Sequence, residues 1–232
     1  MMKIAGVLGG MGPIATIDLL NKIVEYTDAK KDSDHIHTLV DSYTEIPDRT
    51  AYILGQGENP EKHLIDSALK LEAMGASFIV MPCNTAHYFY EKVCGAVKIP
   101  FINMIDEVAK ELDGVKKVGL LATKGTYKGH IYENILNRYK IDVKIPPMDM
   151  QEIVTELIYN IKEGKDNIDQ VPIDQVLDYF SGLGVDKIIL GCTELPVAFN
   201  RLKIEGKFLD PTKILAVSTI KLMGKKLKDV KN

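Results

Sequence analysis

The stretch FIVMPCNTAH at residues 78–87 decides how this chain folds. Its apolar residues are typical of a buried strand, and the Asn-Thr pair after Cys83 is typical of the start of a helix. The stretch KIILGCTELP at residues 187–196 has the same organisation, with Cys192 in the place of Cys83. Each stretch is therefore predicted to place a thiol at a strand end, where the backbone N–H groups of the next turn are free.

Further segments repeat at similar distances along the chain. GVLG at residues 6–9 corresponds to GLLA at residues 119–122, an offset of 113, while the two cysteines are 109 apart and Phe101 and Phe208 are 107 apart. Three matches in one order predict an internal duplication. Ligands of parallel sheets bind outside the carboxyl ends of the strands. Two facing halves are thus expected to bring Cys83 and Cys192 to one cleft.

Apolar runs of strand length alternate with segments of helical periodicity along the chain, which predicts parallel sheets flanked by helices. The fold class we expect is α/β, with two similar Rossmann-like domains related by a pseudo-two-fold axis and an active site in the cleft between them. The predicted boundaries are residues 1–98 plus 211–232 for the first half and 99–210 for the second. The final helix, from Pro211, is expected to pack on the first half. Residues 41–59 are predicted to form a long loop over a site or an interface.

Composition excludes several classes of protein. The net charge of -3 over 232 residues favours neither nucleic acid nor an acidic membrane surface as a partner. No apolar run reaches the roughly 18 residues that span a bilayer. The three cysteines are too few for a disulfide framework, so we expect free thiols and a cytoplasmic location.

Two thiols on opposite sides of a small molecule permit one specific chemistry. One thiolate removes a proton from a carbon while the other thiol protonates the opposite face, which yields the mirror image without a cofactor. Hydrogen-bond donors must then stabilise the developing charge. The candidates at the predicted strand ends are Asn84, Thr85, Thr123, Thr126, Thr193 and the N–H groups of the glycine turn at residues 10–12.

Four motifs resemble signatures of the aspartate/glutamate racemase family, and the resemblance covers almost the whole chain. They are GGMGP at residues 9–13, EIPDRT at 45–50, MPCNTAH at 81–87 and GCTELP at 191–196. The resemblance implies two α/β domains with the active site between them, cofactor-independent two-base racemisation of a small amino-acid substrate, and a homodimer.

The resemblance also assigns roles to residues. It implies that Cys83 acts on the D-enantiomer and Cys192 on the L-enantiomer, and that Arg49 and Lys162 bind the side-chain carboxylate of the substrate. A bidentate guanidinium suits that carboxylate.

Three positions differ from those in glutamate racemases. Where those enzymes carry an acid and a serine after the first strand and a histidine after the second cysteine motif, this chain has Gly10, Met11 and Glu194. These differences favour aspartate as the substrate.

Other interpretations stay open. The chain could be a racemase of broader specificity that includes glutamate, a non-catalytic dicarboxylate-binding protein, or an isomerase or decarboxylase of dicarboxylic acids. Arg49 could simply pair with Asp48 at the surface, Lys162 could face a helix C-terminus, and His87 could either tune a thiol or fill a polar niche. Glu194 could bond near Cys192 or cap a helix.

Two kinds of cofactor are not expected. The glycine turn is a weak match to a dinucleotide fingerprint, because no acidic residue ends a second strand about twenty residues later. The histidines at positions 35, 37, 63 and 130 show no metal-ligand spacing with one another or with the cysteines, so we predict no metal.

Overall fold

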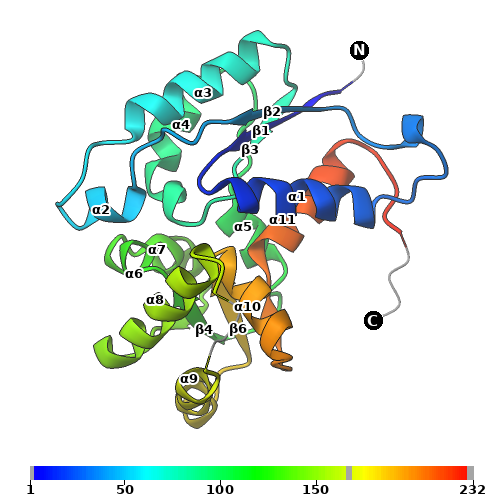
Figure 1. Cartoon of the computed structure of the whole chain (residues 1–232). Coiled ribbons are helices and arrows are strands. Elements are labelled where there is room, and N and C mark those ends of the chain that lie inside the picture. Colours follow the sequence, from blue (N-terminus) through cyan, green and yellow to red (C-terminus); the bar gives the residue numbers. More distant parts are fainter. Residues whose placement is uncertain (1–2, 166–168, 229–232) are drawn as a thin grey trace.

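The computed structural model describes residues 3–165 and 169–228, which form two parallel sheets wrapped by helices (Figure 1). The first sheet has the order β2-β1-β3 and the second β5-β4-β6-β7. All strand pairs within both sheets are parallel. The predicted α/β class with two parallel sheets is confirmed.

The first half runs from β1 to α4 and places its sheet in the upper part of Figure 1. Its elements are β1 (Ala5–Gly9), α1 (Pro13–Tyr26), the 3-10 turn η1 (Asp32–Asp34), β2 (Thr38–Ser42), α2 (Arg49–Ile53), α3 (Glu61–Ala73), β3 (Phe78–Val80), the 3-10 turn η2 (Thr85–Phe89) and α4 (Tyr90–Ala96).

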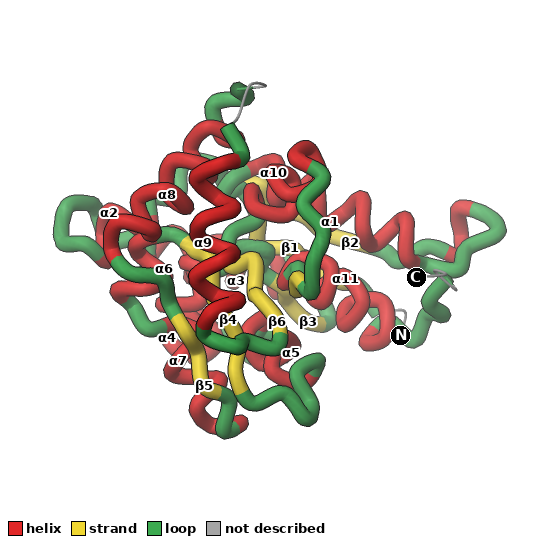
Figure 2. The backbone as a smooth tube through the Cα atoms, turned by 90° about the horizontal axis from the view of Figure 1, so that it is seen from below, coloured by secondary structure: helices red, strands yellow, loops and turns green. Residues whose placement is uncertain are grey.

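The second half begins with α5, and Figure 2 shows the molecule from below, on the side where this half lies. Its elements are α5 (Met104–Lys110), β4 (Lys117–Ala122), α6 (Lys124–Lys128), α7 (Ile131–Leu136), the 3-10 turn η3 (Asn137–Tyr139), β5 (Asp142–Lys144), α8 (Met148–Lys162), α9 (Val171–Gly182), β6 (Lys187–Gly191), α10 (Glu194–Leu202) and β7 (Phe208–Leu209). The final helix is α11 (Pro211–Leu222), which returns to the first half.

The two sheets share one strand order, as a duplication predicts. β1 and β4 are the central strands, and each is flanked by the next strand on one side and by the strand that precedes a cysteine on the other. Phe101 extends the first sheet through a parallel bridge to Ile79, and Phe208 pairs with Ile188 in the second. The equivalence of Phe101 and Phe208 in the sequence therefore corresponds to equivalent places in the two sheets.

Side chains alternate between two faces along each buried strand, so each sheet contributes to two apolar clusters. Ala5 and Val7 of β1 face the central cluster, whereas Leu8 faces α3 and α4. In the second sheet, Leu120 faces the central cluster and Leu121 faces α8, α9 and α10. Strands such as β1 and β4 are covered on both faces, and for this reason their sequences are continuous apolar runs.

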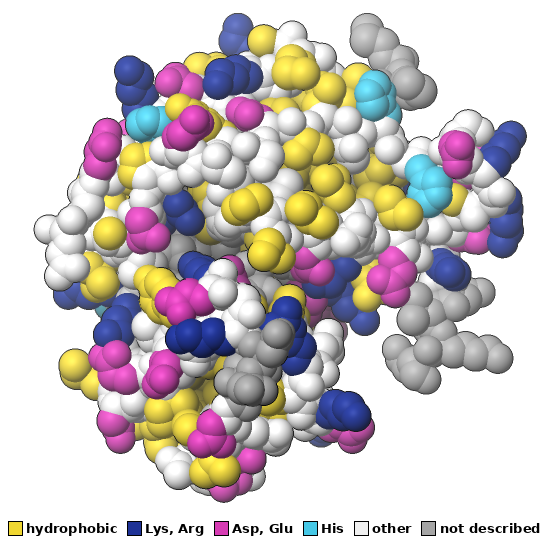
Figure 3. Space-filling model, in the orientation of Figure 1, with side chains coloured by type: hydrophobic (Ala, Val, Ile, Leu, Met, Phe, Trp, Pro, Cys, Tyr) yellow, Lys and Arg dark blue, Asp and Glu magenta, His cyan; other side chains and the backbone are white. Residues whose placement is uncertain are grey.

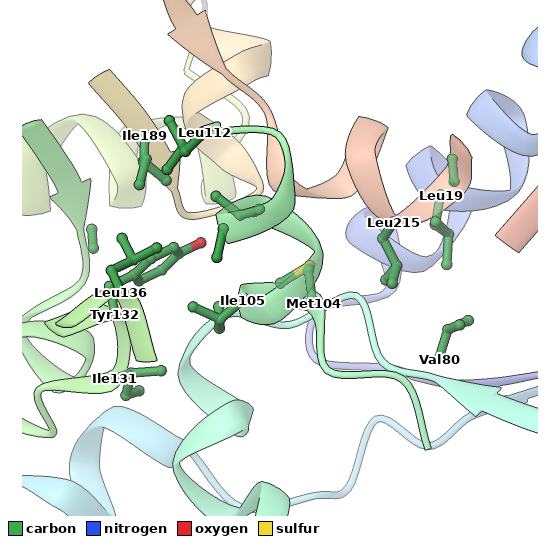
Figure 4. Close-up of a cluster of buried hydrophobic side chains, with 14 of the residues drawn as sticks. Leu19, Val80, Met104, Ile105, Leu112, Ile131, Tyr132, Leu136, Ile189 and Leu215 are labelled. Carbon is green, nitrogen blue, oxygen red and sulfur yellow. The ribbon is translucent and has the colours of Figure 1, made fainter. Parts of the chain in front are cut away.

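The central cluster joins the halves through α5, α7 and α11 (Figure 4). Leu19 of α1 and Leu215 of α11 lie at one end of the view, and Tyr132 and Leu136 of α7 at the other. The final helix, α11, packs against α1 and α5. Both halves thus rest on one shared core, while the residue boundaries predicted for two separate domains remain a prediction.

One predicted element is wrong. Residues 41–59 were expected to be a loop, but they contain the helix α2. The side chain of Asp48 accepts a hydrogen bond from the Ala51 N–H at 2.7 Å and caps the first turn. This short helix holds Arg49 and Thr50 against the second half, where a Cβ added to Gly125 of α6 would lie 2.8 Å from the Thr50 Cα. Glycine is needed there for α2 and α6 to approach.

Candidate active site

One pocket between the halves collects most of the predicted site residues. Its cavity is about 30 Å³, and Figure 3 shows the hollow between the upper and lower parts of the molecule with Lys and Arg side chains near it. The residues that line it are Met11, Asp48, Arg49, Thr50, Cys83, Asn84, Thr85, Thr123, Lys162, Cys192, Thr193 and Glu194. Both cysteines are buried and free.

The backbone at Cys83 is held by His87, one turn further along the chain. The Met104 N–H donates to His87 Nε2 at 3.1 Å, so Nδ1 carries the proton and donates to the Cys83 carbonyl at 2.8 Å. Burial lowers the pKa of His87 to about 4, which keeps the ring neutral. Of the two roles left open by the sequence, these bonds favour a structural one, because the ring contacts the carbonyl of Cys83.

Cys192 follows β6 and lies against a carboxylate. Its Sγ donates to Glu194 Oε2 at 2.9 Å, and the Thr193 hydroxyl donates to the same oxygen at 3.1 Å. Burial raises the pKa of the Cys192 thiol well above its ordinary value, and the negative charge of Glu194 adds to this, whereas the positive charge of Lys162 opposes it. Cys192 is therefore a protonated thiol in the free protein. Glu194 therefore bonds near Cys192, which is one of the two roles that the sequence left open for it.

Three threonine hydroxyls meet across the boundary between the halves. Thr85 of η2 lies 3.0 Å from both Thr123 and Thr126, which lie 3.1 Å from each other. Thr85 and Thr123 line the pocket, but Thr126 does not. Its side chain is fully buried, and it bonds to Thr85 and Thr123. Thr126 was predicted to contact a substrate directly, but here it contacts residues that line the pocket.

Gly10 also lies outside the pocket wall, although it was predicted as a donor. Its N–H donates to the Thr16 hydroxyl at 2.9 Å and is therefore already engaged. A Cβ at this position would lie 2.4 Å from the Tyr43 backbone, and φ is +91°, so glycine serves the turn itself. Its neighbour Met11 is the residue of this turn that lines the pocket.

The Arg49 guanidinium has an open donor. Nη1 donates to the carbonyls of Ile46 and Pro47 at 3.1 and 3.0 Å, while Nε is buried and has no hydrogen-bond partner among the described residues. A buried donor of this kind calls for an acceptor, and a bound carboxylate would supply one. Asp48 uses its carboxylate as a helix cap, so the two neighbours have separate roles.

Lys162, at the end of α8, supplies the second cation of the pocket. Partial burial acts to lower the pKa of its ammonium, but neighbouring acidic groups outweigh this and raise the pKa: Cys192 in its thiolate form, the Glu194 carboxylate, and Cys83 in its thiolate form. Its Nζ also lies 5.4 Å from the centre of the Tyr159 ring. Lys162 therefore stays charged beside both thiols.

Three residues of the site were missed by sequence reasoning. Asp48 and Thr50 line the pocket, and the Tyr132 hydroxyl donates to Asn84 Oδ1 at 2.5 Å. Burial raises the pKa of Tyr132 well above its ordinary value, so its hydroxyl keeps the proton. This bond uses the amide oxygen of Asn84, so its amide N–H groups are the donors that remain. The only available signal for Asp48 and Thr50 was their position in the EIPDRT motif, on either side of Arg49.

Within residues 3–165 and 169–228, no group of three or more His, Cys, Asp or Glu side chains could hold a metal ion. No helix there is both long and apolar enough to cross a membrane.

Known proteins are similar to this chain in both sequence and fold. A family model described as Asp/Glu/Hydantoin racemase matches residues 8–219. The broad-specificity amino-acid racemase of Bacillus subtilis (strain 168) is 31% identical over 225 residues, which cover 93% of this chain and 96% of that protein. The structure of the aspartate racemase of Picrophilus torridus is 35% identical with a TM-score of 0.85, and the match covers 97% of this chain and 96% of that one.

A third match shows the fold alone. The glutamate racemase of Francisella tularensis subsp. tularensis, in complex with D-glutamate, has a TM-score of 0.70 at 23% identity. The match covers 96% of this chain and 80% of that one. Together, these matches show that known racemases have the same α/β fold.

Proposed function

The chain belongs to the Asp/Glu/hydantoin racemase family, and from that premise we propose that it interconverts L- and D-aspartate, with Cys83 and Cys192 as the two acid–base groups and no cofactor. One observation carries this proposal. The two cysteines follow equivalent strands of two similar sheets and line the same small pocket, together with Arg49 and Lys162.

The proton transfers use one thiolate and one thiol. With D-aspartate, the Cys83 thiolate removes the α-proton while the Cys192 thiol protonates the opposite face of the carbanion. With L-aspartate, the two residues exchange roles. After each turnover the two thiols have exchanged protonation states, and proton exchange restores the starting form.

Cys192 must lose a proton before it can act as a base, and its neighbours supply the means. The bond from its Sγ to Glu194 Oε2, at 2.9 Å, gives that proton an acceptor. The Lys162 ammonium lowers the pKa of the same thiol and so favours the thiolate. In the opposite direction, the raised pKa of Cys192 suits it to donate a proton to the carbanion.

The substrate's charges match the groups around the thiols. The side-chain carboxylate binds Arg49, whose buried Nε lacks an acceptor among the described residues, and Lys162. The α-carboxylate takes donors from Asn84, Thr85, Thr123 and Thr193, which also line the pocket. Fixed donors around that carboxylate stabilise the negative charge that develops when the α-proton leaves.

The test is isotope exchange. In D2O, the protein should convert L-aspartate into α-deuterated D-aspartate without added pyridoxal phosphate, as followed by NMR and chiral chromatography. Absence of exchange with both enantiomers would exclude racemisation of aspartate. Calorimetric binding of aspartate without exchange would instead support a non-catalytic dicarboxylate-binding protein.

The cysteines are tested by replacement with alanine. Cys83→Ala and Cys192→Ala should each abolish racemisation, because each removes one of the two acid–base groups. Cys94→Ala is the matched control, since Cys94 on α4 does not line the pocket. Retention of racemisation in both single variants would rule out the two-base mechanism.

A racemase of broader specificity is the second candidate. The relative from Bacillus subtilis that matches 93% of this chain is named as a broad-specificity amino-acid racemase. The same exchange measurement over a panel of amino acids, glutamate included, separates the two candidates. Product assays with maleate and a substituted malonate separate racemisation from isomerisation and decarboxylation.

A further inference from the structure

A small side chamber adjoins the active-site pocket on the side of Glu194, and its volume is about 60 Å³. Lys162, Thr193 and Glu194 line both spaces, whereas the two cysteines of the pocket do not line the chamber. Glu194 accepts the hydrogen bond of the Cys192 thiol. The carboxylate bonded to Cys192 is therefore part of the partition between the pocket and the chamber.

Three helices enclose the chamber. α1 contributes Ala15 and Asp18, α10 contributes Val197, and the end of α8 closes the third side. Ile14 and Arg201 also line the chamber, and both are exposed to solvent. The chamber thus leads from the partition to the surface of the molecule.

The lining of the chamber suits water. A space of about 60 Å³ has room for a few water molecules. A water molecule in such a space needs about two to four polar partners. The Lys162 ammonium, the Thr193 hydroxyl and the carboxylates of Asp18 and Glu194 can supply them.

Only one of the two reacting thiols has a bonded carboxylate that reaches the chamber. Cys192 Sγ donates to Glu194 Oε2 at 2.9 Å. A carboxylate has two oxygens, so Glu194 can accept from the thiol and from water at the same time. Within the part of the chain that the structure describes, Cys83 has no such carboxylate at its sulfur.

A bound substrate would obstruct the other route to solvent. The active-site pocket has a volume of about 30 Å³, so a ligand between the thiols takes up the space that water could use. A proton that Cys192 has removed from the α-carbon then needs a route that does not pass the ligand. The partition at Glu194 offers one.

We propose that the side chamber is a proton channel, through which Cys192 exchanges its proton with water by way of Glu194 while the substrate stays bound. The inference rests on the proposed function, because it takes Cys192 as the base for L-aspartate. The proton moves from Sγ to Oε2 of the Glu194 carboxylate and then to water in the chamber. A proton from that water returns to the sulfur by the same steps in reverse.

The channel makes the two enantiomers differ in D2O. From L-aspartate, Cys192 removes the α-proton, exchanges it for a deuteron through Glu194 and returns the deuteron to the same face of the carbanion. Deuterated L-aspartate then forms without inversion. From D-aspartate, Cys83 returns the proton that it removed, because it has no channel.

The experiment compares exchange without inversion from each enantiomer. At low conversion, the deuterium in the recovered starting enantiomer is divided by the deuterium in the inverted product. We expect this ratio to be about tenfold higher or more for L-aspartate than for D-aspartate. Glu194→Gln keeps the size of the side chain but cannot take up the proton, so it should reduce the L-aspartate ratio to that of D-aspartate.

Two results of this comparison would overturn the channel. One is an equal ratio for both enantiomers with the wild-type protein, and the other is an excess that Glu194→Gln leaves unchanged. An excess for D-aspartate that Glu194→Gln removes would support the channel and reverse the assignment of the cysteines to the enantiomers.

A second pair of variants tests the chamber itself. Val197 lines the chamber and also a separate groove beside α1, whereas Ile204 lines that groove but not the chamber. Val197→Phe should fill the chamber and lower the L-aspartate ratio, and Ile204→Phe should keep the wild-type ratio. Equal ratios in these two variants would overturn the chamber as the route.

A failure of the proposed function gives a different pattern. If no amino acid exchanges its α-proton, racemisation is excluded, and the channel is tested on the free thiol in a protein with Cys83→Ser and Cys94→Ser. Rapid mixing with D2O, followed by infrared spectroscopy, measures the loss of the Cys192 S–H band. Glu194→Gln and Val197→Phe should each slow that loss several-fold relative to Ile204→Phe, and equal rates in all three would overturn the channel.

Discussion

Two charged residues act in opposite directions on the Cys192 thiol. Its pKa is raised first by burial and then by the Glu194 carboxylate, while the Lys162 ammonium lowers it. Glu194 thus favours the protonated thiol that donates, and Lys162 favours the thiolate that accepts. The thiol is the favoured form overall, and the Lys162 charge is what brings the thiolate closer to it in free energy, as a group that must also act as a base requires.

This balance predicts two shifts of opposite sign. Glu194→Gln removes a negative charge and should lower the apparent pKa of Cys192, whereas Lys162→Gln removes a positive charge and should raise it. The measurement is the pH dependence of alkylation at Cys192, followed by mass spectrometry in a protein that carries Cys83→Ser and Cys94→Ser. Identical pH profiles for both variants would contradict the assignment.

Local motifs made some residues predictable and left others hidden. Cys83 and Cys192 could be identified because each follows an apolar run and the two runs repeat, and Glu194 could be identified because it lies two residues from its partner. Tyr132 could not, because it reaches Asn84 from 48 positions away, and no local pattern indicates a contact between two halves.

At the scale of elements, His87 joins η2 to the start of α5. Its ring accepts from the Met104 N–H and donates to the Cys83 carbonyl, and the first of these bonds requires the neutral form, because a protonated ring has no acceptor nitrogen. The pKa of about 4 in the folded protein lies below the ordinary value of 6.5, so folding favours the neutral ring. This stabilisation is complete above pH 6.5 and is lost as the pH falls towards 4.

Acid should therefore weaken the wild-type protein more than a variant that lacks this ring. Between pH 7 and pH 5, the free energy of unfolding of wild type should fall by about 2 kcal/mol more than that of His87→Gln. Urea denaturation at both pH values measures it, and His37→Gln, at an exposed position, is the control. If the free energy of unfolding of His87→Gln fell with pH as steeply as that of wild type, the His87 ring would not take up a proton when the protein unfolds.

The elements themselves were largely predictable from periodicity. Apolar runs predicted the strands, because both faces of each sheet are covered and the strands are therefore apolar throughout. Pro13 indicated the start of α1. The helix α2 was missed because it has only five residues, too few for a helical period to show. Its capping residue, Asp48, was the one local signal available.

At the scale of the molecule, three hydroxyls bridge the halves beside the pocket. Thr85 belongs to the first half, while Thr123 and Thr126 belong to the second. Thr126 does not line the pocket but holds the two residues that do, so it is a positioning residue in the proposed site.

Thr126→Val removes this hydroxyl at nearly constant volume and should lower kcat/KM for aspartate by about tenfold. Thr126→Ser, which keeps the hydroxyl, should restore most of it. Thr219→Val is the matched control, because Thr219 is equally buried but bonds only within α11. Equal kcat/KM in Thr126→Val and Thr219→Val would remove the positioning role.

How the halves meet was only partly predictable. The repeat indicated two similar sheets and a shared cleft, and α11 packs against the first half. The shared core through α5 and α7 was not apparent, because apolar periodicity shows that a face is buried without showing against what. The contact of Gly125 with Thr50 was not predictable either, because a glycine in a helix does not indicate which residue packs against it.

The small size of the pocket leads to an expectation about the order of events when a ligand arrives. Because the space beside the thiols is only about 30 Å³, we expect the halves to part before an amino acid enters. The observed association rate should then level off as the ligand concentration rises, at a ceiling equal to the rate of opening. In a stopped-flow experiment, every amino acid that the protein accepts would reach that same ceiling, however different their affinities are.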